Sequence, residues 1–417
     1  MIQSENSKST KEIILDTAFS FLETPRFTSF SMNELAAKVG ISKPAIYRHF
    51  TNKDALLDAM ENLIVENLSD FLKEINSSNI ENTKKSLGKL VEYFVHNPTH
   101  INYLIAQMSS TPNYEERLFK KLYESNISFV KKGNENTYLE NFRSDIAAFV
   151  KHVFSGMTIF FFVKVQEKLR KNSQISETPE NFGDKIVNLL LSGLRGTTQK
   201  TDDLYPEQIS AERQSELISL CKIDQKTFPE ENRIFTALAN VIEKYKMPGV
   251  TVERIADELG MAKSSLYEYF DNKNQMIKSL VNKELQLLQT IIIENSTEAK
   301  TFAEYIIVLL ASEMEYFSHR PSIIPICGWL LMGGENISEQ NKENCESEGS
   351  VSPWEKRFPD RVISPDLGFP YSPEVITGWI RCLPIAFLVE AKGKNLSPEK
   401  HREGFTLMID YILNGIK

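Results

Sequence analysis

Two segments of the chain carry hydroxyl, phenol and cationic side chains in the same order and at the same spacing. Residues 31–53 read SMNELAAKVGISKPAIYRHFTNK, and residues 251–273 read TVERIADELGMAKSSLYEYFDNK, so they align without a gap at an offset of 220 residues. The identical positions include Ala36/Ala256, Gly40/Gly260, Lys43/Lys263, Tyr47/Tyr267, Phe50/Phe270, Asn52/Asn272 and Lys53/Lys273. Hydroxyl and ammonium groups are donors that bind phosphate oxygens. These residue types therefore favour binding to a phosphate-bearing partner.

The first segment has the local signals of two short helices around a tight turn. Ser31 can cap a helix, and Glu34, three residues later, completes a capping box. Gly40 can adopt the positive φ that ends this helix. Ser42 can cap a second helix, with Pro44 in its first turn, where the missing N–H costs nothing. The pattern predicts a helix-turn-helix whose second helix presents its outer face.

A helix presented in this way fits the major groove of duplex DNA, with its first residues at the base edges. The first segment contains Gly-Ile-Ser-Lys-x-x-Ile-Tyr-x-His-Phe-x-Asn-Lys, and the second contains Gly-Met-Ala-Lys-x-x-Leu-Tyr-x-Tyr-Phe-x-Asn-Lys. Both patterns resemble the signature of the TetR family of bacterial transcriptional regulators. The resemblance covers about 60 residues of each half of the chain.

The resemblance implies the same plan in each half. A DNA-binding head of three helices is followed by a linker helix and by a helical body that binds a small ligand and dimerises through its last two helices. The DNA contacts implied for the first head are Ser31, Ser42, Lys43, Pro44, Ala45, Tyr47, Arg48, His49 and Lys53. Those implied for the second head are Thr251, Ala262, Lys263, Ser264, Ser265, Tyr267, Tyr269 and Lys273. A ligand that binds the body better when the linker helices are splayed would shift the population to that arrangement and so release the heads from DNA.

The two segments differ in charge. Residues 31–53 carry four cations against one acid, whereas residues 251–273 carry three cations against five acids, so their net charges are +3 and −2. Attraction to phosphate dominates the affinity of proteins for DNA. Glu268 stands where the first segment has Arg48, and it either repels the DNA backbone or accepts a hydrogen bond from cytosine. The charge favours weak DNA binding by the second head, or none.

The repeat extends to the ends of the two halves, since VNLLLSGLR at residues 187–195 matches IDYILNGIK at residues 409–417. Apolar residues recur with the period of amphipathic helices, and no segment shows sustained strand alternation, so we predict an all-α fold. The predicted domains are a first head at 1–54, a first body at 55–200, a linker at 201–228, a second head at 229–274 and a second body at 275–417. A short helix at 207–221 is predicted inside the linker.

Two such units in one chain suggest a covalent pseudodimer. The closing helices, 182–194 and 405–416, would pack with 141–169 and 373–392 as a four-helix interface. Unlike recognition helices would then read unlike half-sites of an operator in double-stranded DNA. The alternative is self-association between chains, which would give a four-headed assembly.

The bodies could hold a small hydrophobic or amphipathic ligand. The aromatic candidates are Phe149, Phe154, Phe161, Trp329, Trp354 and Trp379, for which core packing is the alternative role. The six His show no metal-ligand spacing, and the four Cys form no CxxC pair. We find no catalytic triad, phosphate-cradling glycine loop or paired acids, so we predict no enzyme, no metal and no cofactor.

The composition is that of a globular protein. The 417 residues are 41% hydrophobic and 25% charged, which excludes collagen-like and fully disordered chains. The polar N-terminal segment lacks the apolar stretch of a signal peptide. The apolar runs elsewhere are too short to span a bilayer. We therefore expect a soluble cytoplasmic protein. The sequence predicts a ligand-responsive transcriptional repressor, and the alternative is a helical ligand-sequestering or protein-interaction module that has lost DNA binding.

Overall fold

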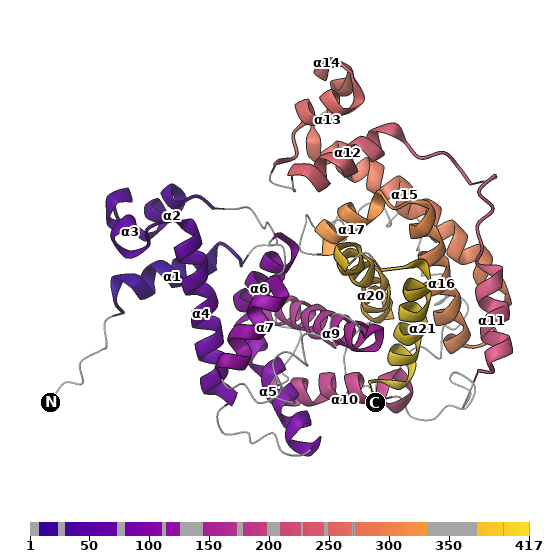
Figure 1. Cartoon of the computed structure of the whole chain (residues 1–417), viewed down its shortest axis with the longest axis horizontal. Helices are drawn as coiled ribbons and strands as arrows, with labels where there is room; N and C mark the ends of the chain where they lie inside the picture. The colour runs from indigo at the N-terminus through magenta and orange to yellow at the C-terminus, as the bar shows by residue number, and fades with distance from the viewer. Residues whose placement is uncertain are drawn as a thin grey trace. The chain divides into compact units, whose positions relative to one another are not determined.

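The computed structural model contains α-helices and a short 3₁₀ turn, with no strand among the residues it describes, as the all-α prediction requires (Figure 1). The described residues are 8–23, 30–72, 80–110, 114–125, 145–172, 178–197, 209–226, 228–245, 249–268, 270, 272–331, 373–394 and 396–416. They form two compact units. Unit 1 comprises those of 1–140 and 166–184, and unit 2 those of 141–165, 185–331 and 373–416.

The first head consists of α1 (Thr10–Ser20), α2 (Met32–Val39) and α3 (Lys43–His49). The predicted capping box is confirmed, since Ser31 Oγ accepts from Glu34 N at 3.2 Å and Glu34 Oε2 accepts from Ser31 N at 2.6 Å. Gly40 ends α2 with φ of 80°. Ser42 stands before α3 with extended backbone, but its side chain makes no capping bond, so the predicted cap is wrong. Its hydroxyl stays exposed instead.

The second head consists of α12 (Arg233–Tyr245), α13 (Val252–Leu259) and α14 (Lys263–Tyr267). Thr251 caps α13 by accepting from Arg254 N at 3.2 Å, and Gly260 ends it with φ of 64°. The turn between the helices therefore follows the same backbone path in both heads. This equivalence is what the repeated glycine predicts.

The body helices of unit 1 follow the first head. They are α4 (Lys53–Leu72), α5 (Ile80–His96), α6 (Pro98–Ser110) and α7 (Tyr114–Glu124), joined by the adjoining ends of α9 (Ile146–Lys171) and α10 (Pro179–Thr197). Helix α5 packs closely on α10. The closeness is shown at Gly183, where an added Cβ would lie only 2.6 Å from the carbonyl oxygen of Gly88. Small residues let two helix backbones approach to this extent.

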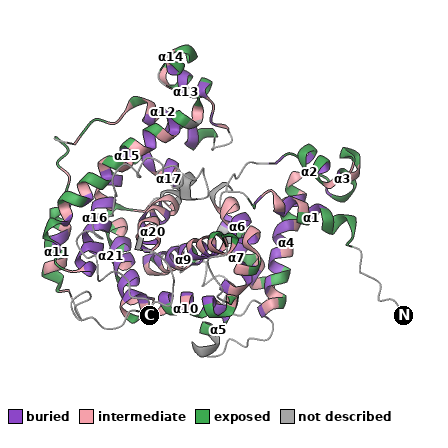
Figure 2. Ribbon diagram, turned by 180° about the vertical axis from the view of Figure 1, so that it is seen from behind, coloured by how far each residue is buried: buried purple, intermediate pink, exposed green. Residues whose placement is uncertain are grey.

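The body of unit 2 contains the rest of α9 and α10 and the helices of the second half. These are α15 (Lys273–Asn295), the short η2 (Ser296–Glu298), α16 (Phe302–His319), α17 (Ile323–Leu331), α20 (Pro373–Lys394) and α21 (Pro398–Asn414). Helix α16 is buried on every side over most of its length, as its purple colour shows (Figure 2). Its apolar run, which reads YIIVLLA at residues 305–311, accounts for this position because such a helix must be covered all round.

In unit 2 the closing helices of the first half pack against those of the second. The indole N–H of Trp379 on α20 donates to Thr158 Oγ1 on α9 at 3.0 Å, and the Trp379 ring lies 6.1 Å from that of Phe154. Ile416 N, after α21, donates to Leu190 O in α10 at 2.8 Å. These contacts agree with the four-helix interface that the repeat predicts, and they place residues 145–165 and 185–197 of the first half in unit 2.

Helix α9 is the one described helix that is long and apolar enough to cross a membrane. However, 61% of its most apolar window is buried inside the protein. Packing against α20 and α21 explains its composition, since a core helix passes the same test.

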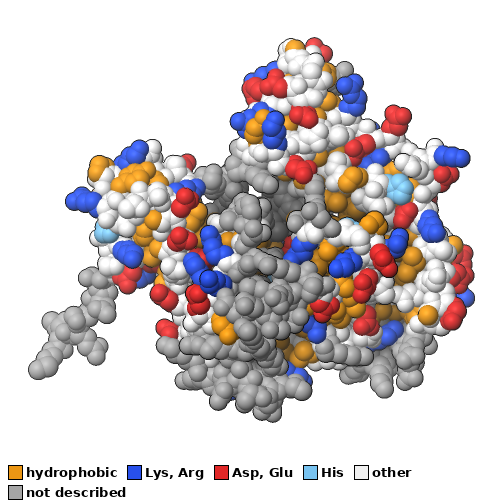
Figure 3. Space-filling model, in the orientation of Figure 1, with side chains coloured by type: hydrophobic (Ala, Val, Ile, Leu, Met, Phe, Trp, Pro, Cys, Tyr) orange, Lys and Arg blue, Asp and Glu red, His pale blue; other side chains and the backbone are white. Residues whose placement is uncertain are grey.

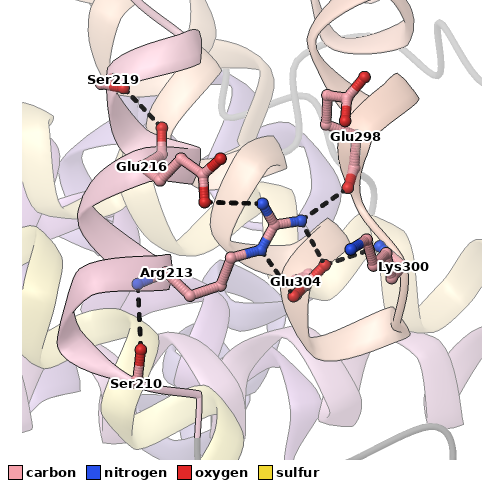
Figure 4. A network of polar contacts seen from close by, with 7 residues as sticks. All are labelled: Ser210, Arg213, Glu216, Ser219, Glu298, Lys300 and Glu304. Atoms are coloured by element: carbon pink, nitrogen blue, oxygen red, sulfur yellow. Dashed lines mark hydrogen bonds and ion pairs between the residues drawn. The ribbon is translucent and has the colours of Figure 1, made fainter.

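A helix between the halves is docked on unit 2. This helix, α11 (Ala211–Leu220), confirms the predicted linker helix and packs along α16. Arg213 binds both oxygens of Glu304 on α16, at 3.0 and 3.1 Å, and the carbonyl of Glu298 at 2.8 Å (Figure 4). Burial alone would raise the pKa of Glu304, but the bonds from Arg213 and from the Lys300 N–H outweigh it and hold that pKa below its ordinary value. The connector is thus fixed to the second body.

Candidate nucleic-acid interface

Helix α3 of the first head buries one face and exposes the other. Ile46 is fully buried and Phe50 nearly so, which fixes the helix against α2. The outer face carries Tyr47, which is 40% exposed, with Ser42, Lys43, Pro44, Arg48 and His49 exposed and Ala45 half-buried. In Figure 3 the surface of this head shows Lys or Arg side chains and a histidine. The face therefore offers hydroxyl, phenol and cationic donors together.

The Asn-Lys pair that closes the motif has a structural part in both heads. Asn52 Oδ1 accepts from Ala55 N at 2.8 Å, and Asn272 Oδ1 accepts from Gln275 N at 2.9 Å, so these amides cap the linker helices α4 and α15. Asparagine is a favoured cap for this reason. The sequence contains this signal, since an asparagine stands directly before each lysine that opens a linker helix.

The lysine of this pair binds the main chain of its own head. Lys53 Nζ donates to the carbonyl of Phe30 at 2.7 Å and lies 5.0 Å from the centre of its ring. Lys273 Nζ donates to the carbonyl of Val250 at 3.2 Å, the matching residue. Burial lowers the pKa of Lys53. Each lysine thus ties the start of a linker helix to the residue before the cap of the middle helix, and its predicted phosphate contact stays a prediction.

The second head presents a different set of groups. Ala262, Lys263, Ser264 and Tyr267 are exposed and Ser265 is half-buried, while Leu266 fills the core position. Tyr269 lies outside the described residues. Asp and Glu side chains appear beside Lys and Arg at the surface of this head (Figure 3). The matched positions therefore lie on an outer face, as in the first head, but among acids.

The cations of the second motif are engaged within their own head. Lys263 Nζ pairs with Glu253 Oε1. The Arg254 guanidinium lies 4.2 Å from the centre of the Tyr245 ring and donates to the carbonyl of Gly249. With Lys273 bound to Val250 O, all three cations of residues 251–273 have partners in the head. The charges can be counted in the sequence, but their partners are brought to them by the fold.

Unit 1 joins its head to its body through buried polar groups. Asn102 Nδ2 on α6 donates to the carbonyl of Leu22, just after α1, at 2.8 Å. His100 on the same helix lies 4.5 Å from the Phe19 ring of α1, and its Nδ1 is 2.7 Å from Tyr93 Oη on α5. Burial lowers the pKa of His100 to about 4, so the imidazole is neutral at pH 7. No motif in the sequence pointed to these contacts.

Each linker helix carries a buried carboxylate that body helices hold. Glu61 on α4 is fully buried and pairs with Arg117, at 3.2 Å, and with Lys121, both on α7. Glu284 on α15 is 6% exposed, accepts from Tyr316 Oη on α16, and lies 3.4 Å from Arg320 Nε. The two glutamates are not matched positions of the repeat, yet both fix a linker helix to its body.

The predicted ligand-binding aromatics are mostly core residues of the four-helix interface. Phe149, Phe154 and Trp379 are at most 2% exposed, and their rings contact other aromatic rings of α9, α20 and α21. Phe161 is half-buried, with its ring against the surface of Gly378. Trp354 and the side chain of Trp329 lie outside the described residues. Their contact with a ligand stays a prediction.

Comparison with known proteins supports the resemblance of both heads to TetR-like regulators. The model of the tetR family of bacterial regulatory proteins matches residues 14–60 and 234–280. Each match covers one helix-turn-helix and the first turns of the linker helix behind it. The chain is a tandem TetR-like transcriptional regulator.

The TetR-like regulator is also similar to a curated protein. It is 17% identical over 281 residues to an uncharacterized HTH-type transcriptional regulator, YxbF, of Bacillus subtilis strain 168. The match covers 66% of this chain and 67% of the relative, so it extends well beyond a single head. Among the described residues of the regulator, no group of three His, Cys, Asp or Glu side chains could hold a metal ion.

Proposed function

We propose that one chain of this regulator acts as a covalent pseudodimer that binds duplex DNA with the first head as its anchor. The observation that carries the proposal is the outer face of α3, where Lys43, Tyr47 and Arg48 are exposed while Ile46 is buried. Such a face suits phosphate and base contacts in the major groove. The cytoplasm is where such a regulator would meet DNA.

The four-helix interface supports a single-chain pseudodimer. Helices α9 and α10 meet α20 and α21 inside unit 2, so closing helices of both halves are used within one chain. A second copy would then have no free set of these helices to pair with. Because the recognition helices differ, the operator would contain unlike half-sites.

The response to a ligand is the second part of the proposal. A ligand that binds better to one arrangement of the linker helices shifts the population towards it and so changes DNA affinity. Glu61 and Glu284, which tie α4 and α15 to their bodies, are the contacts that such a shift would have to break. We propose release from the operator, and hence repression, as the direction of the response.

A polar pair inside the second body supports a ligand with a hydrogen-bond donor. Glu313 on α16 is fully buried, and its Oε1 accepts from Arg381 Nε on α20 at 2.8 Å. Its other oxygen is buried without a hydrogen-bond partner in the described part of the chain. An unsatisfied buried acceptor costs free energy that a donor on a ligand would recover.

Binding of the full chain to labelled mixed-sequence duplex, measured by fluorescence anisotropy at several salt concentrations, tests the DNA-binding proposal. We expect Tyr47→Ala/Arg48→Ala to weaken binding by about tenfold or more and to lower the salt slope by about one. Lys84→Ala, which removes an exposed cation of α5, is the control and should leave both values unchanged. Equal binding by the Tyr47→Ala/Arg48→Ala variant and the wild type would reject α3 as the contact helix.

The second candidate is a module that has lost DNA binding in one or both heads. It is favoured by one observation, the internal partners of all three cations in residues 251–273. It predicts no salt-dependent binding to any duplex if both heads are inactive. The same anisotropy titration therefore separates the two proposals.

A further inference from the structure

The second head holds its base-reading lysine in an ion pair. We propose that Glu253 keeps Lys263 away from DNA, so that one acid weakens the second head and makes the regulator bind its operator asymmetrically. The inference rests on the proposed DNA-binding function and names a residue that sets the strength of one head. It concerns a glutamate that the motif itself does not mark.

The pair joins the two helices of the second helix-turn-helix at their first turns. Glu253 is the second residue of α13 and Lys263 is the first of α14, and the Oε1 and Nζ atoms are in direct contact. The side chains are 52% and 47% exposed, so the pair lies at the surface. Lys263 is also the residue that the family pattern places at the base edges. A carboxylate bound to Lys263 there competes with DNA for its ammonium group.

The first head supplies the matched comparison. Asn33 occupies the position of Glu253, because the offset is 220 residues. Lys43, the counterpart of Lys263, lies 6.0 Å from the centre of the Tyr47 ring and has no acidic partner among the described residues. Lys263 lies 5.5 Å from the Tyr267 ring in the same way. The two lysines thus share an aromatic neighbour and differ in the acid.

Glu253 is the acid whose removal frees a cation in the second head. Arg254 and Lys273 donate to main-chain carbonyls of the head, and no substitution of a side chain removes these acceptors. Glu268, in the position of Arg48, is an exposed acid and does not pair with Lys263. Asp257 is exposed on the same helix as Glu253 and is likewise not bound to Lys263.

The physics of a surface ion pair sets the size of the effect. An exposed pair of this kind is worth at most about 1 kcal/mol, so it competes with a phosphate contact without preventing it. Each phosphate contact adds about 0.9 to the slope of log affinity against log salt for duplex DNA. Freeing Lys263 should therefore raise the slope by about one. The ratio of the variant's affinity to that of the wild type should therefore grow by about threefold as the salt concentration falls from about 200 to about 50 mM.

The experiment compares full-length Glu253→Asn with the wild type on a mixed-sequence duplex of about 30 base pairs, by anisotropy across about 50 to 200 mM salt. We expect a steeper slope and tighter binding for the variant. The matched control is Asp257→Asn, which removes the same charge from the same helix without touching Lys263 and should change the slope much less. Circular dichroism and thermal melts check that each variant is folded.

A double variant shows whether the effect passes through the lysine. In Glu253→Asn/Lys263→Ala the gain should disappear, because the freed cation is absent. A gain that persists in the double variant, or an equal gain in Asp257→Asn, would overturn the inference and assign the effect to net charge alone. The reciprocal change, Asn33→Glu, should weaken the first head by a similar factor.

Failure of this inference is distinguishable from failure of the proposed function. If the wild type binds duplex with a salt slope and Glu253→Asn leaves it unchanged, the ion pair does not control the second head, while DNA binding stands. If neither protein binds at any salt, the proposed function fails. Adding Glu253→Asn to the Tyr47→Ala/Arg48→Ala variant isolates the second head and should restore part of the lost binding.

Discussion

Gly193 and Gly415 hold matching places in the two halves and meet backbone to backbone in unit 2. They are 222 residues apart, and both have positive φ, 60° and 77°. A Cβ added to Gly193 would lie 2.5 Å from the main-chain nitrogens of Asn414 and Gly415, and one added to Gly415 would overlap the main chain of Leu191. The end of α21 thus crosses α10 at equivalent glycines, as expected of a pseudo-two-fold contact.

Substitution of Gly193 by alanine should destabilise unit 2 by about 2 kcal/mol or more. The positive φ disfavours any side chain, and the Cβ would overlap the main chain rather than a movable side chain. Urea denaturation followed by circular dichroism measures the effect. Gly156→Ala is the control, because Gly156 lies exposed within α9 with nothing near its Cβ position and should gain about 0.5–1 kcal/mol. If Gly193→Ala left the free energy of unfolding unchanged, the close crossing of α21 and α10 would be contradicted.

The docking of the connector helix α11 on α16 should depend on Arg213. Arg213→Gln removes the two bonds to Glu304, which is 10% exposed, and we expect a loss of about 1–2 kcal/mol at pH 7. Glu216→Gln, which breaks the pair that Arg213 makes with a 60% exposed carboxylate, should cost less than about 0.5 kcal/mol. Urea titrations of both variants check this order, and equal losses would contradict it.

The Arg213 contact also predicts a pH dependence. The pKa of Glu304 is lower in the folded protein than its ordinary 4.5, so the folded state favours the ionised form. This stabilisation is present above pH 4.5 and is lost as the pH falls through the folded pKa. The stability difference between wild type and Arg213→Gln should therefore shrink below pH 4.5. A constant difference down to the acid transition would exclude the ion pair as its source.

His100 is a base that is buried in its neutral form. Its pKa falls from 6.5 to about 4, so between these values the unfolded chain binds more protons and stability decreases as the pH is lowered. Between pH 7 and pH 5 this should cost the wild type about 1–2 kcal/mol that His100→Gln does not lose. Urea unfolding at the two pH values measures the difference. Parallel losses in both proteins would mean that the imidazole is not buried in this way.

Local signals in the sequence predicted the heads well, because caps and turns depend on neighbouring residues. The capping box at Ser31 and the left-handed Gly40 are found where the pattern places them. The cap at Ser42 failed because that pattern does not report whether a hydroxyl turns towards the helix. The repeat also predicted which closing helices meet, since equivalent helices of a two-fold unit pair with each other.

Contacts between helices were not predictable from spacing alone. The Glu253–Lys263 pair spans ten residues and forms only because α13 and α14 turn at Gly260. The resemblance implies a phosphate contact for Lys53 but not its bond to the Phe30 carbonyl, which the fold brings to it from 23 residues away. His100 carries no motif, and its role comes from the packing of α1 on α6. Such features need the tertiary structure.

The molar mass of the full chain by light scattering, alone and with the mixed-sequence duplex at low salt, tests the central claim most directly. A single-chain pseudodimer predicts a particle of 47.7 kDa that adds one duplex per chain. A particle of twice that mass without DNA would contradict the internal pairing of α9 and α10 with α20 and α21. A monomer that forms no complex with duplex at low salt would contradict the DNA-binding half of the claim.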